Sequence, residues 1–487
     1  MRLLPWFSTL ALSLLLLACG GDDDGDRPSP PPPGPPLAGD RIEPLDTALL
    51  KQQPRLALAQ AASRLPAGAQ VARIELGPLS ELKHATAGAS DGPLQIGVGR
   101  DIAATDNAVA LGQLLNWTFL SDGTRVAALS FVTEGARAVR LGVQVMQLPP
   151  GTVLRFYGES GLDGVEMAAD EIQAAYRALR EAGVSESEAR LVWGPDTTGA
   201  VATLEVQLPT GADVSQLQLA VPQLSHLHQT VAQVLQPKDV SDIGDAGSCH
   251  VDVACTAHDS ESRAVAKMLY TKAGSTFLCT GTLMNDSKNS LTPYFLTAAH
   301  CVDDGSSASS LITYWFFRAT SCGHSRDPDR DMVRLTGGAS LLDVHYPSDI
   351  SLLQLRSQPP ARVVYAGSYF GSEAKPGVQV LGVHHPMGDL QKISEGSIRG
   401  YYNCNRNGMC SSSPPERADM LQVIWDRGST EGGSSGSAIF VRFDSSKRYV
   451  AGTLHGGNAS CQRPSGSDFY GRYDKAFAAG LARWLRP

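Results

Sequence analysis

The C-terminal half of this 487-residue chain consists of short apolar runs separated by turn residues. Seven such runs are AVAKMLY (264–270), YFLTAAH (294–300), LITYWFF (311–317), DISLLQL (349–355), VQVLGVHH (378–385), AIFVRF (438–443) and YVAGTLH (449–455). Short bounded runs are typical of antiparallel strands in a barrel or sandwich. The half ends in DKAFAAGLARWL, whose apolar residues are spaced as on one buried helix face. We therefore expect a β-barrel domain over residues 247–487 that ends in a helix.

Residues 39–237 have a different pattern and predict a separate β-rich domain, since the chain is too long for one core. Apolar residues alternate in VRLGVQV (139–145) and ATLEVQL (202–208), as in half-buried strands. DEIQAAYRALREAG (170–183) has helical spacing and a terminal glycine, and residues 45–65 also have helical spacing. We predict a β-sandwich with a helical insertion, acting as a pro-domain or accessory module without catalytic residues of its own.

The first 38 residues predict export. Arg2 precedes an apolar run that is too short for an ordinary transmembrane helix and is typical of a secretory signal over residues 1–18. The run ends in Leu-Leu-Ala-Cys19, which resembles the bacterial lipobox, so we expect Cys19 to carry a lipid anchor in the outer membrane or cell surface. Ordinary signal cleavage with Cys19 unmodified is the alternative. The acidic and proline-rich residues 19–38 predict an extended tether.

Cysteine usage agrees with export. Apart from Cys19, the chain has Cys249, Cys255, Cys279, Cys301, Cys322, Cys404, Cys410 and Cys461. An even set in an exported chain predicts disulfides. A zinc site would need closely spaced ligand pairs, and CHVDVAC and CNRNGMC are too widely spaced for that. The sequence implies no metal and no organic cofactor.

The overall charge excludes one class of partner. The formal net charge is −8, the pI is near 5.8, and no run is rich in lysine or arginine. Nucleic-acid binding normally requires a basic face, so we expect no nucleic-acid partner.

Residues with candidate catalytic chemistry lie in or just before three of the apolar runs. His300 ends FLTAAH, Asp349 precedes ISLLQL, and Ser435 lies within EGGSSGS. Each alone has an ordinary interpretation: a packed histidine, a turn aspartate, a linker serine. In the order His, Asp, Ser they match one known order of the hydrolase triad and exclude the α/β-hydrolase and subtilisin orders.

The proposed chemistry requires these residue types. Serine is a poor nucleophile at neutral pH, so His300 would take the proton of Ser435 and later protonate the leaving amine. Asp349 would hold the imidazole tautomer and stabilise the imidazolium. The glycines around the serine would let the N–H groups of Gly433 and Ser435 converge on the oxyanion.

Six blocks in order resemble the lysyl endopeptidase branch of the chymotrypsin-fold serine peptidases. They are GSCHVDVAC, YFLTAAHC, VHHPMGDLQKIS, TEGGSSGSAIF, LHGGNASC and SDFYGRY. The resemblance covers residues 247–487 and implies a double β-barrel; for residues 39–237 a resemblance to pro-regions is vaguer. It also implies the disulfides Cys249–Cys461, Cys255–Cys322 and Cys279–Cys301, which leaves Cys404–Cys410 as a local loop.

The resemblance also implies how the substrate side chain is chosen. Trypsin binds the cationic side chain of its substrate with an aspartate in the pocket. The corresponding position in this chain is Ser429, so the aspartate is absent. In lysyl endopeptidases a later strand supplies the acid, at the position of Asp468 in SDFYGRY. We expect Asp468 to bind a lysine ammonium; the alternative is a solvated loop acid.

The LHGG block should lie along the substrate. His455 and Gly456 occupy the substrate-binding strand of the family, where the histidine stacks on a tryptophan. This chain lacks the family's tryptophan in the corresponding block, IRGYYNC, which offers Tyr401 or Tyr402 in its place. His384 and His385 match another block, and we expect them to be structural.

These inferences predict a monomeric serine endopeptidase that cuts protein and peptide substrates after lysine. The alternatives are a trypsin-like peptidase of different specificity and an inactive envelope lipoprotein with a peptidase fold. If residues 39–237 are a pro-domain, cleavage near Lys238 would release the enzyme; otherwise it is a tethered surface peptidase.

Overall fold

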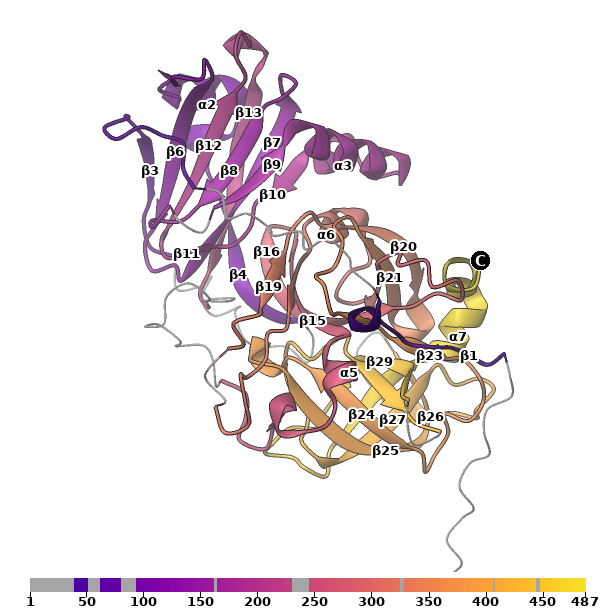
Figure 1. The fold of residues 1–487 in the computed structure, drawn as a ribbon. Helices are drawn as coiled ribbons and strands as arrows, with labels where there is room; N and C mark the ends of the chain where they lie inside the picture. Colours follow the sequence, from indigo (N-terminus) through magenta and orange to yellow (C-terminus); the bar gives the residue numbers. More distant parts are fainter. Residues whose placement is uncertain are drawn as a thin grey trace, which may run out of the picture. The chain divides into compact units, whose positions relative to one another are not determined.

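The computed structural model describes residues 39–50, 62–79, 93–161, 164–229, 245–324, 328–405, 408–443 and 447–487 (Figure 1). The predicted signal, the tether with Cys19, and Lys238 lie outside these residues. The described ranges all belong to one compact unit, Pro35–Pro487. Within them, no helix combines the length and apolar character needed to cross a membrane.

Residues 72–227 form the predicted β-sandwich (Figure 1). One sheet has the order β3 (Ala72–Leu76), β6 (Arg125–Thr133), β12 (Val201–Leu208), β8 (Val153–Tyr157) and β9 (Val165–Ala168), with β5 (Thr118–Phe119) beside β6. The other contains β10 (Leu191–Trp193), β7 (Ala138–Gln147), β13 (Gln218–Leu227) and β4 (Leu94–Asp101), with β11 (Thr197–Thr198) beside β7. The alternating residues predicted to share a face, among them Val139, Leu141 and Leu204, are buried in the common core. The predicted helical insertion is α3 (Ala169–Glu181); α2 (Ala108–Leu114) and α4 (Glu186–Ala189) are shorter.

The first barrel of the C-terminal half is built from seven antiparallel strands. These are β15 (Val265–Lys272), β16 (Ser275–Met284), β17 (Tyr294–Ala298), β18 (Ile312–Trp315), β19 (Val333–Leu335), β20 (Ala339–His345) and β21 (Ile350–Leu355). Alternate side chains such as Met268, Phe295 and Leu353 fill its interior. The short α6 (Gly305–Ser309) lies between β17 and β18 in sequence.

The second barrel closes on itself. The ring runs through β24 (Gln379–His384), β25 (Lys392–Cys404), β27 (Met420–Arg427), β30 (Ser467–Arg472), β29 (Tyr449–Gly457) and β28 (Ala438–Val441), which pairs with β24 again. Two short strands, β14 (Val251–Asp252) and β26 (Cys410–Ser412), also pair with β25. The predicted C-terminal helix follows as α7 (Tyr473–Ala476), a π-helical turn (Phe477–Leu481) and α8 (Ala482–Leu485), with Phe477, Leu481 and Leu485 buried. The predicted double β-barrel is thus confirmed.

The sandwich and the first barrel share a sheet. β4 pairs antiparallel with β16, with Gly97 opposite Thr276. Arg140 on β7 is fully buried at the same junction, where its guanidinium donates to Gly194 O (3.0 Å), Thr271 Oγ1 (2.8 Å) and Ser310 O (2.9 Å). Arg140 lies on the face of β7 opposite the apolar residues Val139 and Leu141, and it is buried because the first barrel packs on that face.

The first described residues pair with the barrels rather than with the sandwich. β1 (Arg41–Ile42) pairs with β23 (Gly367–Tyr369), and β2 (Leu45–Asp46) pairs with β22 (Val364–Tyr365). The helix expected over residues 45–65 is therefore wrong at its start, where a strand and the 3-10 turn Thr47–Leu49 occur; residues 51–61 lie outside the described ranges.

Four disulfides join the eight cysteines of the barrels. The pairs are Cys249–Cys461, Cys255–Cys322, Cys279–Cys301 and Cys404–Cys410, as the family resemblance implied.

Candidate active site

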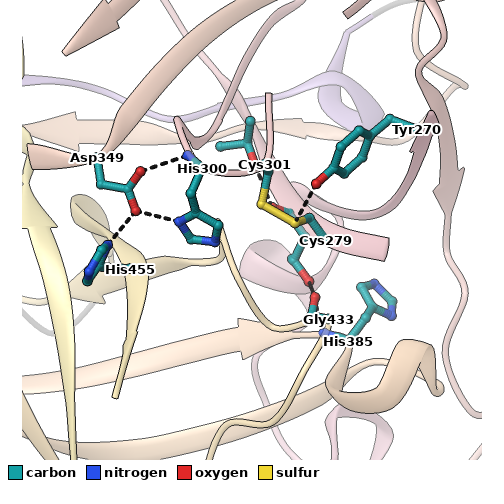
Figure 2. The surroundings of a disulfide bond; sticks show 10 residues. Tyr270, Cys279, His300, Cys301, Asp349, His385, Gly433 and His455 are labelled. Carbon is teal, nitrogen blue, oxygen red and sulfur yellow. Dashed lines mark hydrogen bonds and ion pairs between the residues drawn. A yellow bond between two sulfur atoms is a disulfide. The ribbon is translucent and has the colours of Figure 1, made fainter. Parts of the chain in front are cut away.

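Strand pairing brings His300 and Asp349 together. His300 follows the end of β17 and Asp349 precedes β21, and these strands pair with Ala298 opposite Ile350. His300 Nδ1 lies 2.5 Å from Asp349 Oδ2, and the His300 backbone N–H donates to Asp349 Oδ1 over 2.8 Å (Figure 2). Both carboxylate oxygens therefore hold the same histidine, which fixes the direction of its ring.

Asp349 is a buried carboxylate in an unusual backbone conformation. Its φ of 50° and ψ of 46° are left-handed, and its N–H donates to Tyr346 O over 3.1 Å. Burial alone would raise its pKa, but the charge and hydrogen bond of His300, together with the hydrogen bond of His455, lower the pKa to about 2. The group is thus a carboxylate at neutral pH.

His455 on β29 contacts the same carboxylate oxygen. Its Nδ1 lies 2.7 Å from Asp349 Oδ2, and its ring meets that of His300 edge-on at 5.8 Å between centroids (Figure 2). The expected stacking of a tyrosine on His455 is not found among the ring contacts of the described residues: Tyr402 packs on Phe469, and Tyr401 lies under Arg472. Both tyrosines thus have partners other than His455.

Potential metal ligands also meet at this point. One ligand atom each from His300, Asp349 and His455 lies within 4.8 Å of the others. The two Nδ1–Oδ2 distances, 2.5 and 2.7 Å, are those of imidazole N–H donors to a carboxylate. A metal would need both nitrogen lone pairs to face the ion instead, so the contacts favour hydrogen bonding over ligation.

The loop of Ser435 is held against the end of β17. Thr280 anchors it twice, by donating N–H to Ser435 O (2.8 Å) and Oγ1–H to Gly433 O (2.9 Å). A Cβ at Gly436 would lie 2.9 Å from Ala298 N and 2.5 Å from Thr280 O, so only glycine fits there. The neighbour of Thr280, Cys279, is bonded to Cys301, next to His300 (Figure 2). Ser435 is therefore placed close to the backbone that carries His300.

The remaining nitrogen of His300 is unpaired. Nε2 is buried and has no hydrogen-bond partner among the described residues, Ser435 included. Catalytic hydrogen bonds are often loose before substrate binds. The ring thus has one nitrogen committed to Asp349 and the other open to a further group.

Two backbone N–H groups of the serine loop are also uncommitted. In the described part of the chain, no hydrogen bond is donated by the N–H of Gly433 or of Ser435. Gly432 O accepts from Met387 N over 2.6 Å, and in a trans peptide the following N–H points the opposite way. The loop therefore has two free donors, at the positions predicted for an oxyanion hole.

His384 is linked to the serine loop, a link that the sequence did not reveal. Its Nε2 lies 2.9 Å from Ser394 Oγ, whose hydroxyl donates to Ser429 O over 2.5 Å. Nε2 must therefore be the donor to Ser394, which makes Nδ1 the acceptor of the Ser434 hydroxyl at 2.8 Å. Burial lowers the pKa of His384 far below the usual value, in keeping with this neutral form.

His385 was also expected to be structural, and it lies fully buried beside the same loop. Its Nδ1 donates to Asp389 O over 3.0 Å, and burial lowers its pKa to about 3. The only sequence signal for either histidine was the VHHPMGD block.

Asp468 on β30 is a buried acid with one unpaired oxygen. Only 1% of the residue is exposed. Its Oδ2 accepts from Trp425 Nε1 (2.7 Å) and Thr430 Oγ1 (2.6 Å), whereas Oδ1 has no partner of hydrogen-bonding geometry among the described residues. Burial raises the pKa of Asp468 although Thr430, Trp425 and the Ala459 N–H lower it.

The other predicted pocket residues lie near this acid. Ser429 follows β27 and is buried, and its Oγ has no partner among the residues described. Gly456 pairs with Phe469, next to Asp468 across the β29–β30 ladder. Trp425 and Thr430 were missed from the sequence, because nothing local connects them with a strand forty residues further on.

Comparisons with known proteins agree with these observations. The family model of the lysyl endopeptidase N-terminal domain matches residues 67–228, and that of the lysyl endopeptidase C-terminal domain matches residues 243–471. A lysyl endopeptidase of Pseudomonas aeruginosa is 31% identical over 415 residues, which cover 81% of this chain and 82% of the relative.

Solved structures give weaker matches. The thermostable serine protease AL20 from an extremophilic microorganism is 12% identical with a TM-score of 0.33, over 47% of this chain and 99% of that one. The protease Anisep from Arthrobacter nicotinovorans is 14% identical with a TM-score of 0.32, over 47% and 98%. The fold assignment rests on the strand pairing described above.

Proposed function

The chain belongs to the lysyl endopeptidase family of serine peptidases, and we propose that it hydrolyses peptide bonds after lysine with His300, Asp349 and Ser435 as its triad. One observation carries the triad: both oxygens of Asp349 hold His300, so that Nδ1 is committed and Nε2 is open. This is the arrangement that a general base for a serine requires.

The reaction follows from these contacts. His300 Nε2 takes the proton of Ser435 as its oxygen attacks the substrate carbonyl, and Asp349 stabilises the imidazolium. The N–H groups of Gly433 and Ser435 bind the oxyanion; the loss of one such donor typically costs about 3 to 4 kcal/mol. His300 then protonates the leaving amine, and water hydrolyses the acyl-enzyme by the same steps. His455 acts as a positioning residue for Asp349.

Specificity for lysine is supported by Asp468. Its Oδ1 is buried and, apart from the nearby Ala459 N–H, has no donor among the described residues, so it can accept a hydrogen bond from a ligand. A lysine ammonium would provide both a hydrogen bond and an opposite charge, whereas no uncharged side chain would provide the charge.

The distribution of lysine in the chain supports lysine over arginine. No lysine occurs from His84 to Pro237, whereas the same stretch contains eight arginines. A peptidase specific for lysine would find no site from His84 to Pro237, where one that also accepts arginine would find eight; Lys83 of the sandwich lies just ahead of this stretch.

Cleavage-site mapping tests the proposal. Purified enzyme is incubated with a denatured protein rich in lysine and arginine, and the new termini are identified by mass spectrometry. We expect cuts after lysine alone, together with fluorophosphonate labelling that is lost in Ser435→Ala. If the enzyme is labelled but cuts after both lysine and arginine, lysine specificity is overturned and the triad is not. If Ser435→Ala is labelled as strongly as the parent, the triad is overturned.

We further propose that the protein is exported and anchored through Cys19. The four disulfides support an oxidising compartment. Labelling of cells with a fatty-acid probe should mark the protein but not Cys19→Ser. The mass of the bound and released forms would test cleavage near Lys238.

A further inference from the structure

Residues 39–50, which we call the N-terminal strap, extend the sheets of the peptidase body, residues 245–487. Arg41 pairs with Tyr369, and Leu45 pairs with Tyr365. Backbone hydrogen bonds continue on both sides, from Phe370 N to Asp40 O (2.9 Å) and from Thr47 N to Val363 O (3.2 Å). In sequence, however, the β-sandwich separates the strap from this body.

The strap also contributes to the hydrophobic core of the body. Ile42 is 4% exposed and belongs to the same cluster as Val450, Tyr473 and Phe477. The body is fitted to the strap backbone as well: a Cβ at Gly367 would lie 2.5 Å from Ile42 O and 2.7 Å from Pro44 N. Removal of the strap would open a cavity in this core and leave an unpaired strand edge.

Charged groups fix the register of the strap. Both oxygens of Asp46 accept from Arg263, over 2.8 and 2.6 Å, and this bond lowers the pKa of Asp46. Glu43 accepts from Lys447 over 2.6 Å and from Tyr449 over 3.2 Å. A bidentate arginine–carboxylate pair that is partly buried is among the stronger surface interactions.

We propose that the strap is an integral strand pair of the peptidase body, which remains bound there after the chain between strap and body is cut. Whatever precedes Gly39 then stays attached to the enzyme when the sandwich is removed. The sequence had placed residues 39–50 in the sandwich domain, and both family models exclude them. The proposal rests only on these contacts, and it is independent of the triad and of lysine specificity.

A cutting experiment on the folded chain tests this. The chain carries Ser435→Ala to prevent self-cleavage, an affinity tag ahead of Gly39, and sites for an unrelated sequence-specific protease within residues 51–61 and within 230–244. After complete cutting, verified on a denaturing gel, the tagged fragment is captured and washed. We expect the tagged strap to retain the fragment that begins near residue 245 in an amount equimolar with the strap. Loss of that fragment in the wash, or capture of the sandwich without it, would overturn the proposal.

Strap variants provide the specificity control. Ile42→Asp and Asp46→Ala should each reduce the retained body at least tenfold, whereas Leu49→Ala should not, because Leu49 is 82% exposed. If Ile42→Asp prevents folding, Asp46→Ala carries the test, with circular dichroism before cutting as the check. Equal retention by Asp46→Ala and Leu49→Ala would show that these contacts do not hold the strap.

Discussion

His455 Nδ1 lies 2.7 Å from Oδ2 of Asp349, the oxygen that also accepts from His300. Two imidazoles therefore share one carboxylate oxygen, while the second oxygen is held by the His300 backbone. An acceptor with this many donors is strongly stabilised as the anion. The arrangement makes His455 a support for the charge and the direction of Asp349.

We predict that His455→Ala lowers kcat about tenfold or more with little change in KM. A hydrogen bond to a charged group is worth about 1.5 to 3 kcal/mol, and this one orients the carboxylate that holds His300. Steady-state kinetics on a lysine reporter peptide measures the split, and His455→Asn, which keeps an N–H donor, should recover part of kcat. A rise in KM alone would argue instead for a substrate-binding role.

We predict that Asp349 contributes acid-sensitive stability. Its folded pKa of about 2 lies below the ordinary 3.8, so its contribution, about 2 kcal/mol, is complete above pH 4 and is lost as pH falls through about 2. Urea unfolding from pH 6 down to pH 2 should show the stability gap between the parent and Asp349→Asn narrowing in that window. A constant gap would contradict the ion pair.

We predict that Asp468→Asn stabilises the protein while it abolishes cleavage after lysine. A carboxyl group whose folded pKa is raised destabilises the fold above its unfolded pKa, and asparagine removes this cost. The melting temperature at pH 7 should rise, and kcat/KM for lysine peptides should fall a hundredfold or more. A lower melting temperature with lysine preference intact would show that Asp468 is structural.

We predict that acidification weakens the binding of lysine peptides but not the binding of peptides with a neutral side chain. As pH falls through the raised pKa of Asp468, the carboxyl is protonated and loses its attraction for an ammonium. KM for a lysine peptide should therefore rise at acidic pH, whereas that for its norleucine analogue should not. Parallel pH profiles for the two peptides would refute the assignment.

We predict that Arg140→Ala loosens the sandwich from the peptidase body. The change leaves Gly194 O, Thr271 Oγ1 and Ser310 O without their buried donor. In a Ser435→Ala chain cut within residues 230–244 and within 51–61, association of the sandwich should weaken at least tenfold by analytical gel filtration. Arg177→Ala, at an exposed position of α3, is the matched control and should have no effect.

The sequence predicted those features whose residues lie in local motifs. His300 and Asp349 were found because each adjoins an apolar strand, and the pairing of β17 with β21 brings them together. The alternation of apolar residues predicted which face of β7 (Ala138–Gln147) is buried in the sandwich. It did not predict the burial of Arg140 on the opposite face, because that burial depends on the barrel strand that carries Thr271.

Other features depend on contacts between distant segments. Residues 45 and 46 have helical spacing but form a strand, because β22 offers an edge to them. Trp425 and Thr430 meet Asp468 only when β27 and β30 become neighbours. The tautomer of His384 is determined by Ser394 and Ser429, which no local pattern connects with it.

The hydrogen bonds between β4 and β16 affect how quickly the sandwich can leave the barrels after the chain is cut. Cutting the chain between sandwich and barrels does not break this ladder, because its backbone bonds are independent of the connecting segment. Separation requires the strands to unzip, with Leu94 leaving the vicinity of Gly432 in the serine loop. After the cut, the sandwich would therefore stay bound to the barrels for a time that is set by the rate at which β4 separates from β16.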